Sequence, residues 1–238
     1  MLNIARVGVD IAKSVFHVHG VDRQDRVQWR GKYARGKWLE ELVGQRTSKA
    51  NQIRGLVGGY GLIAPKGIEQ LRRALPGWLE DAENGLSDAF RVLLADLAGD
   101  LRHLDERVAS LTAEIERRAR QDPVAQRLLT LRGVGPLVAS ALAGALGDGR
   151  AFRRGRDFAA SLGLTPRQHS TGGRDRLLGI SKRGDSYLRK LLVHGARAVL
   201  RHADGRDDGL SRWLLALTAR KHVNVAVVAL ANKTARIA

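Results

Sequence analysis

Large apolar residues between Phe90 and Ile115 recur at alternating spacings of four and three residues. They are Phe90, Leu94, Leu97, Leu101, Leu104, Val108, Leu111 and Ile115. This spacing puts all of them on one face of an α-helix. The pattern predicts a single long helix from Asp88 to Arg118. The Asp122–Pro123 pair should end it, because the residue before a proline disfavours helical backbone.

The apolar stripe of this helix has two interpretations. It can pack against the chain's own core, or it can form a coiled-coil seam with a second copy of the chain. The length of the predicted helix favours the seam. We therefore expect a homo-oligomer held through residues 88–118, and the intrachain alternative stays open.

The N-terminal segment has the alternation of β-strands. Residues 6–21 are rich in valine and predict two strands joined by a turn near Ala12 to Ser14, with Asp10 closing the first strand. A third strand is expected around Val27 to Arg30, and Lys37 to Val43 is typical of the start of a helix. A meander of about forty residues buries too little surface to be stable alone. Either it packs on something else or its continuation is missing.

The remainder, Pro123 to Ala238, predicts short helices separated by glycine-rich turns, with a strand-like pattern only at Val223 to Val228. The fold class is therefore mainly α with a small N-terminal β-hairpin piece. The apolar run from Val223 to Ala231 is too short for a bilayer, so we expect a soluble, cytoplasmic protein without a membrane partner. The absence of cysteine excludes disulfides and thiolate zinc sites.

The charge of the chain points to a polyanionic partner. Lys and Arg number 41 against 24 Asp and Glu, which gives a formal net charge of +17. Such an excess favours nucleic acid, because cations that neutralise phosphates release counterions. The stretch from Arg150 to Arg206 alone holds 14 Lys and Arg against 4 Asp. A protein that is merely soluble and basic remains the alternative.

The segment from Leu131 to Pro136 has the layout of a helix-hairpin-helix. Gly133 and Gly135 allow a tight turn between two helical patterns, and free amides at the start of the second helix can hold a DNA phosphate. Such a contact ignores base sequence. An ordinary helix–helix turn is the alternative interpretation.

A glycine- and hydroxyl-rich stretch from Gly163 to Asp185 contains Ser170. A serine can attack a phosphodiester when a base takes its proton and cations stabilise the developing charge; His169 and several arginines are near in sequence. Most serines before Gly-Gly are turn residues, so composition alone does not make Ser170 a nucleophile. The DNA-binding candidates are Gly133, Gly135, Arg167, Gly172, Gly173, Arg174, Arg176, Lys182 and Arg183.

Asp10 is the candidate metal ligand. A carboxylate at a strand end can bind Mg²⁺, but hard cations need further oxygen ligands. His17 and His19 share a strand face, yet such a pair on an amphipathic hairpin is more often structural.

Three segments resemble the DEDD-type transposases of bacterial insertion sequences, which are bridge-RNA-guided serine recombinases. VGVDIAKSVFHVHGVD, residues 7–22, is similar to the family's first RuvC-like hairpin with its leading Asp. RTSKANQIRGLVGGYGLIAPKGI, residues 46–68, is similar to the helical segment after the catalytic domain. Residues 163–199, which begin GLTPRQHSTGGRDR, resemble the centre of the C-terminal transposase domain.

The resemblance implies a composite active site. Four acids of an RNase H-like, RuvC-like fold bind Mg²⁺, and a C-terminal serine attacks DNA to form a 5′-phosphoserine link. Asp10 matches the first acid and Ser170 the nucleophile, with Thr171 as a less favoured candidate. A coiled coil, a guide RNA and a tetrameric assembly are implied as well.

The chain departs from the family between its first strands and residue 46. Leu42–Val43 runs almost directly into Arg46, where the family has a long stretch that supplies its second, third and fourth acids. Glu40 and Glu41 do not match the second acid. We therefore divide the chain into a RuvC-like remnant (1–43), a helical linker with the coiled-coil helix (44–122) and a C-terminal transposase domain (123–238).

Three functions follow from this comparison. The chain is a transposase-family DNA-binding protein that is catalytically defective alone, with missing acids possible from an intact protomer. Alternatively, it is a non-catalytic nucleic-acid-binding module that regulates full-length transposase. The least favoured function is that of a general basic architectural protein.

Overall fold

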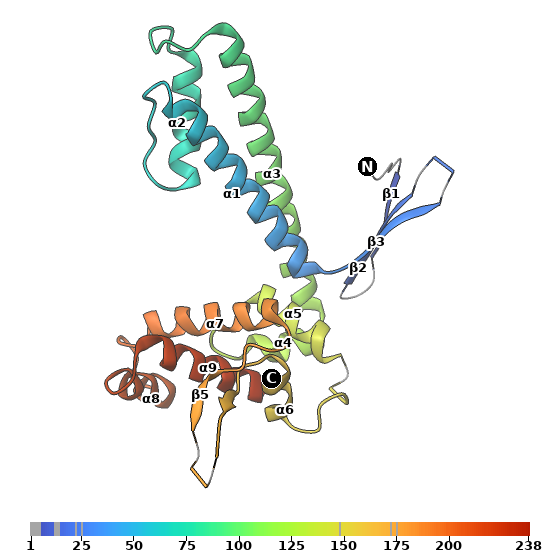
Figure 1. Ribbon diagram of the computed structural model, residues 1–238, viewed down its shortest axis with the longest axis vertical. Coiled ribbons are helices and arrows are strands. Elements are labelled where there is room, and N and C mark those ends of the chain that lie inside the picture. Colours follow the sequence, from blue (N-terminus) through green and yellow to red (C-terminus); the bar gives the residue numbers. More distant parts are fainter. Residues whose placement is uncertain are drawn as a thin grey trace. The chain divides into compact units, whose positions relative to one another are not determined.

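The computed structural model describes residues 6–11, 15–21, 23–24, 26–147, 149–171, 173–174 and 176–238, and for 6–20 and 27–36 it describes the backbone alone. The described chain is mainly helical, as expected (Figure 1). It divides into two compact units, one of residues 37–114 and one that combines 1–36 with 115–238. No helix among the described residues is both long and apolar enough to cross a bilayer.

The N-terminal strands form a three-stranded antiparallel meander. β1 (Arg6–Ile11) pairs with β2 (Val15–Val21), which pairs with β3 (Val27–Ala34). Asp10 lies opposite His17 in the register and is the penultimate residue of β1, not the last. The predicted turn at 12–14 and the side chains of Asp10, His17 and His19 lie outside the described residues.

Residues 37–114 form a three-helix unit. α1 (Arg35–Gly58), α2 (Ile68–Glu80) and the first part of α3 (Asp88–Gln121) enclose one apolar core. Because a long loop separates α1 from α2, side-chain contacts are needed to hold that loop in place. The buried residues of this core are Ala50, Ile53, Val57, Ala64, Leu71, Leu75, Leu86, Leu94, Leu97 and Leu101.

The long helix predicted from the heptad spacing is present as α3. It extends three residues beyond Arg118, and Asp122 then caps the next helix through Oδ1, which accepts from the amides of Val124 and Ala125. Leu94, Leu97 and Leu101 are buried in the core of the three-helix unit. The first half of the stripe therefore has an intrachain partner.

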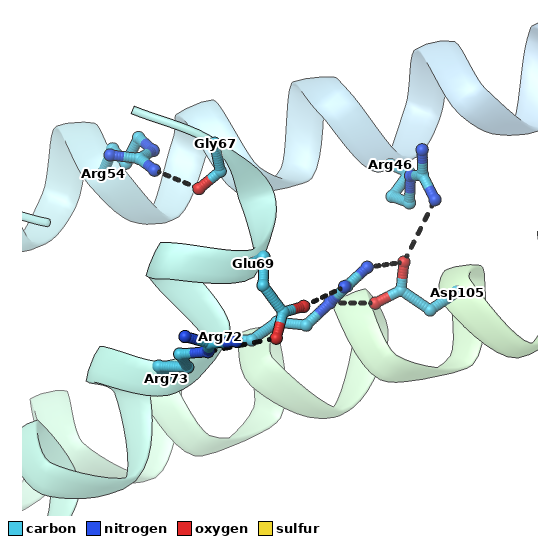
Figure 2. A network of polar contacts seen from close by, with 7 residues as sticks. All are labelled: Arg46, Arg54, Gly67, Glu69, Arg72, Arg73 and Asp105. Carbon is cyan, nitrogen blue, oxygen red and sulfur yellow. Dashed lines mark hydrogen bonds and ion pairs between the residues drawn. The ribbon is translucent and has the colours of Figure 1, made fainter. Parts of the chain in front are cut away.

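Polar contacts clamp this three-helix unit (Figure 2). The Arg72 guanidinium donates to both carboxylate oxygens of Asp105, and Arg46 Nη1 donates to Asp105 Oδ1 at 3.4 Å. These hydrogen bonds raise the pKa of Arg72 above its ordinary value, with Asp105 as the largest cause. Arg54 donates to the carbonyls of Ala64, Pro65 and Gly67 at 2.7–2.8 Å and so holds the loop before α2. The arginines of segment 46–68 thus have structural partners.

Six helices and a hairpin follow α3 in the described residues of the second unit. The helices are α4 (Pro123–Leu129), α5 (Pro136–Leu146), α6 (Gly155–Ser161), α7 (Ser186–Arg201), α8 (Gly209–Thr218) and α9 (Val223–Ile237). Their shared core includes Leu142, Phe158, Leu192, Leu214 and Leu230. α7 and α9 pack against each other, and α6 packs on α9.

Two local expectations for this unit are wrong. The strand-like residues Val223 to Val228 are the start of helix α9, because Ala226, Val227 and Leu230 at helical spacing are buried in the core. The sequence also predicts no strand in the stretch from Gly163 to Asp185. This stretch contains β4 (Pro166–Gln168) paired antiparallel with β5 (Leu177–Ile180).

Candidate nucleic-acid interface

The positive charge of the chain is divided unequally between its parts. Residues 37–114 contain 10 Lys and Arg against 12 Asp and Glu, a net charge of −2. Residues 115–238 contain 24 Lys and Arg against 9 Asp and Glu, a net charge of +15. A polyanion is attracted by the local field rather than by the total charge, so the candidate interface lies in residues 115–238.

Ser170 lies at the exposed end of the β4–β5 hairpin, which extends away from the helices of its unit (Figure 1). Gln168 Nε2 donates to Ser170 Oγ at 2.9 Å. The amide of His169 donates to the carbonyl of Arg176 at 2.9 Å, and the amide of Arg174 donates to that of Thr171 at 3.1 Å. The hairpin is therefore ordered up to the serine, and the carboxamide holds the hydroxyl. An amide N–H cannot take the serine proton, so Gln168 orients Ser170 but is no base.

The cations predicted to accompany Ser170 share this hairpin and its base. Their side chains are exposed, as is Gly173, whereas Gly172 lies outside the described residues. The cations are Arg167, Arg174, Arg176, Lys182 and Arg183.

The base of the hairpin is fixed to the helical core. Gly163 and Gly184 both have positive φ, 67° and 82°, and a Cβ on either would overlap backbone carbonyl oxygens of the opposite segment. Arg189 Nη1 donates to the carbonyl of Leu162 at 2.8 Å, and Asn232 Nδ2 donates to that of Leu164 at 2.8 Å. Glycine is required here because the two segments approach backbone to backbone. The core thus anchors the base of the serine hairpin.

The α4–α5 turn places one of the two predicted glycines against α7 and leaves the other exposed. Gly133 has a φ of 83°, and a Cβ on it would lie 2.8 Å from the carbonyl oxygen of Gly195 in α7. Gly135 is the N-cap of α5 and is exposed; no side chain caps this helix, and Pro136 follows it. Gly133 therefore has a packing role, and the first amides of α5 are the part of this turn that fits a phosphate.

Arg132 in the same turn is tied to the start of α8, a contact that the sequence did not reveal. Its Nη1 lies 2.6 Å from Asp208 Oδ2 and 3.1 Å from Ser211 Oγ, and Ser211 is fully buried. Asp208 caps α8 by accepting from the amides of Leu210 and Ser211. The amide and hydroxyl of Ser211, followed by the charge of Arg132, lower the pKa of Asp208 to about 2. This arginine holds the turn and is engaged within the chain.

Asp208 gives the unit an acid-sensitive contact. A carboxyl whose pKa falls from 3.8 to about 2 on folding adds stability that is fully present above pH 4 and is lost as the pH approaches 2. We expect the melting temperature of the unaltered chain to exceed that of Asp208→Asn at pH 5 and the difference to shrink towards zero at pH 2. Asn keeps a helix cap, so the comparison isolates the charge. A difference that is constant across this range would contradict the assignment.

The predicted magnesium site is not formed by the side chains that the structure describes. None of these His, Asp and Glu side chains come together in groups of three or more that could hold a metal ion. The side chain of Asp10 lies outside the described residues, and its strand partner His17 is not a second carboxylate. Mg²⁺ binding by Asp10 stays a prediction, and no step of the chemistry is derived through it.

Comparisons with known proteins find relatives of this chain among transposases. The model of the Transposase IS116/IS110/IS902 family matches residues 125–209, which include the α4–α5 turn and the serine hairpin. A probable family 20 transposase of Pseudomonas aeruginosa is 36% identical over 324 aligned positions, covering 99% of this chain and 96% of that protein.

Two named insertion-sequence transposases match over a shorter span. The transposase of element IS1111A from Coxiella burnetii is 42% identical over 201 positions, which are 84% of this chain and 55% of that protein. The transposase of IS1328 from Yersinia enterocolitica is 40% identical over 199 positions, 84% of this chain and 59% of that protein. This chain thus spans little more than half of these two relatives. Because the similarity extends along almost the whole Pseudomonas protein, the chain belongs to the IS116/IS110/IS902 family of transposases.

Proposed function

We propose that this chain is a transposase-family protein that binds insertion-sequence DNA through residues 115–238 but does not cut DNA on its own. The observation that carries the proposal is the exposed hairpin with Ser170 at its end, anchored on the part of the chain with a net charge of +15. Backbone amides of the α5 N-terminus and the arginines of the hairpin supply the phosphate contacts. These contacts position DNA without reading its sequence.

The second part of the proposal concerns the catalytic domain. The alignment with the Pseudomonas protein has 324 positions and this chain has 238 residues, so at least 86 positions have no counterpart here. The β1–β3 meander then represents the first strands of a RuvC-like domain with an internal deletion. Because the deleted stretch would supply the second to fourth acids, Asp10 alone cannot complete a Mg²⁺ site.

Ser170 is the proposed nucleophile of the intact reaction. Its Oγ would attack a DNA phosphorus and lose its proton to a base; the P–O3′ bond breaks, the 3′ oxygen takes up a proton, and the phosphate stays on the serine as a 5′-phosphoserine link. The cations of the hairpin would stabilise the charge on the phosphoryl oxygens.

The test is a search for a covalent protein–DNA adduct. Duplex DNA and RNA from the flanks of the gene are incubated with Mg²⁺ and the unaltered chain, Ser170→Ala or Thr171→Ala, and separated on denaturing gels. We expect no adduct from any of the three, and salt-sensitive DNA binding from all of them. An adduct that disappears only in Ser170→Ala would show that the shortened chain still performs the first step, and the proposed defect would be wrong.

A guide RNA and an oligomer belong to this proposal as well. In the second half of the α3 stripe, Leu104, Val108 and Leu111 are half-buried, which leaves room for a seam with a second copy, whereas Ile115 is buried. Leu101 is 1% exposed, so a charge there would unfold the helical unit rather than dissociate an oligomer. Light scattering of the unaltered chain is therefore the appropriate measurement, and a monomer mass would contradict the seam.

The second candidate function is a non-catalytic module that regulates full-length transposase. The anchored base of the hairpin favours it, because DNA binding through residues 115–238 needs no catalytic domain. It predicts that Ser170→Ala inhibits a full-length relative in mixed reactions as strongly as the unaltered chain does. If the missing acids instead come from an intact protomer, only the chain with Ser170 would contribute to strand transfer in the mixture.

A further inference from the structure

Helix α7 carries a stripe of basic residues that no role described so far explains. Its members are Lys190, His194, Arg197 and Arg201. Spacings of four, three and four residues put them on one helix face. All of them are exposed, whereas Leu188, Leu192, Ala196 and Val199 on the other side are buried in the core. We call this stripe the α7 ridge.

The ridge has no acidic residues along its own helix. No Asp or Glu occurs between Asp185 and Asp204. Arg197 Nη2 lies 3.5 Å from the neutral side-chain oxygen of Asn224. Cations that are neighbours on one helix face repel one another, and a bound polyanion would offset that repulsion.

The ridge is also separate from the serine hairpin. In the view of Figure 1, α7 lies along one edge of the helices of its unit and the β4–β5 hairpin projects beyond the opposite edge, with α9 between them. The buried face of α7 packs on α9, so the ridge lies on the exposed side of α7, and within it Arg197 reaches Asn224 at the start of α9. Phosphates bound at the hairpin and phosphates bound at the ridge therefore belong to different stretches of nucleic acid.

We propose that the α7 ridge is a second binding surface for the sugar–phosphate backbone of duplex DNA. The proposal rests on DNA binding by residues 115–238 and adds a site to it. Lys190 and Arg201 are eleven positions apart, a rise of about 16 Å, which runs alongside about five base pairs. Lys and Arg side chains on an exposed helix face reach phosphates without reading bases. The ridge then holds a second DNA segment while the hairpin holds the first.

The salt dependence of binding tests the ridge. The ridge variant carries Lys190→Gln, Arg197→Gln and Arg201→Gln. The control variant carries Arg73→Gln, Arg102→Gln and Arg107→Gln, which remove three exposed cations from the three-helix unit. Each phosphate contact contributes about 0.9 to the slope of log K against log salt. We expect the ridge variant to lose about 2–3 from that slope, equally for unrelated duplex sequences, and the control to keep the slope of the unaltered chain.

The outcomes separate this proposal from the one it rests on. A ridge variant that behaves like the control, while the unaltered chain binds in a salt-sensitive way, overturns the ridge alone. An unaltered chain that does not bind duplex DNA overturns both proposals. Loss of affinity for duplex RNA but not for duplex DNA overturns the choice of DNA. The melting temperature should not fall in the ridge variant, because the altered side chains point away from the core and their mutual repulsion is removed.

Site-directed cleavage locates the second segment. The chain contains no cysteine, so a DNA-cleaving reagent can be attached at one introduced thiol. Ala198→Cys places it beside the ridge and Thr171→Cys places it at the hairpin, and both positions are exposed. We expect the two reagents to cut different stretches of a long duplex. Coincident cuts would show that ridge and hairpin contact the same stretch, and the second surface would not exist.

Discussion

Gly195→Ala should lower the free energy of unfolding by about 3 kcal/mol, the upper part of the range for overpacked cores. Gly195 is in the middle of α7, where alanine is ordinarily better than glycine by about 1 kcal/mol. A Cβ here would overlap the carbonyl oxygen of Gly133 and lie 3.0 Å from its carbonyl carbon. Both atoms belong to backbone and cannot rotate away. The α4–α5 turn and α7 would have to separate, which opens the core near Val199.

Gly99→Ala is the matched control for this substitution. Gly99 also lies inside a helix, α3, and a Cβ there would meet nothing within 4 Å. We expect it to raise the stability of the three-helix unit by about 0.5–1 kcal/mol, since alanine reduces the entropy of the unfolded chain. Urea unfolding followed by circular dichroism measures both variants. If Gly195→Ala stabilises the chain as Gly99→Ala does, the close approach of turn and helix is wrong.

The close approach changes how the α4–α5 turn is understood. The pattern of Gly133 and Gly135 predicts a tight turn made by both glycines, followed by helix amides that hold a phosphate. In the structure the two glycines have different roles, because Gly133 faces α7 whereas Gly135 is exposed at the start of α5. The sequence could not distinguish them, because the partner of Gly133 is 62 residues away at Gly195. DNA binding by variants of Gly135 is consequently the cleaner test of a phosphate contact.

The long helix was predictable and its partner was not. Heptad spacing depends only on local sequence, so Asp88 to Arg118 could be assigned to a helix from the pattern alone. The same pattern indicates that one face of the helix is covered, but it does not identify the segment that covers it. Part of that covering surface is α2, which contributes Leu71 and Leu75 to the core. This helix is short and contains Pro76, a residue type that tends to kink helices.

The serine hairpin shows a different limit of sequence analysis. β4 has three residues and β5 four, all but Ile180 exposed, so no apolar alternation marks them as strands. Their position depends on Gly163 and Gly184, whose close backbone contacts join segments about twenty residues apart. The cluster of Ser170 and arginines could be predicted from composition. Its anchorage on the core could not.

Asp105→Ala should lower the free energy of unfolding of the three-helix unit by about 1–3 kcal/mol, the range for hydrogen bonds to charged groups. Asp105 accepts from Arg72 of α2 and Arg46 of α1, so one carboxylate joins three helices (Figure 2). Its side chain is 21% exposed and that of Arg46 is 24% exposed. Removing the carboxylate leaves two partly buried guanidinium groups close together, and their repulsion adds to the lost hydrogen bonds.

Asp100→Ala provides the control on the same helix. Asp100 forms one ion pair, with Lys49 at 3.0 Å, and its side chain is 61% exposed, so its loss should cost less than about 1 kcal/mol. Thermal unfolding at low and at 1 M salt measures the two variants. Salt should abolish the small effect of Asp100→Ala and leave most of the effect of Asp105→Ala, because partly buried pairs are screened less. Equal effects of both substitutions would mean that Asp105 is an ordinary surface carboxylate and that the apolar core alone holds the three helices.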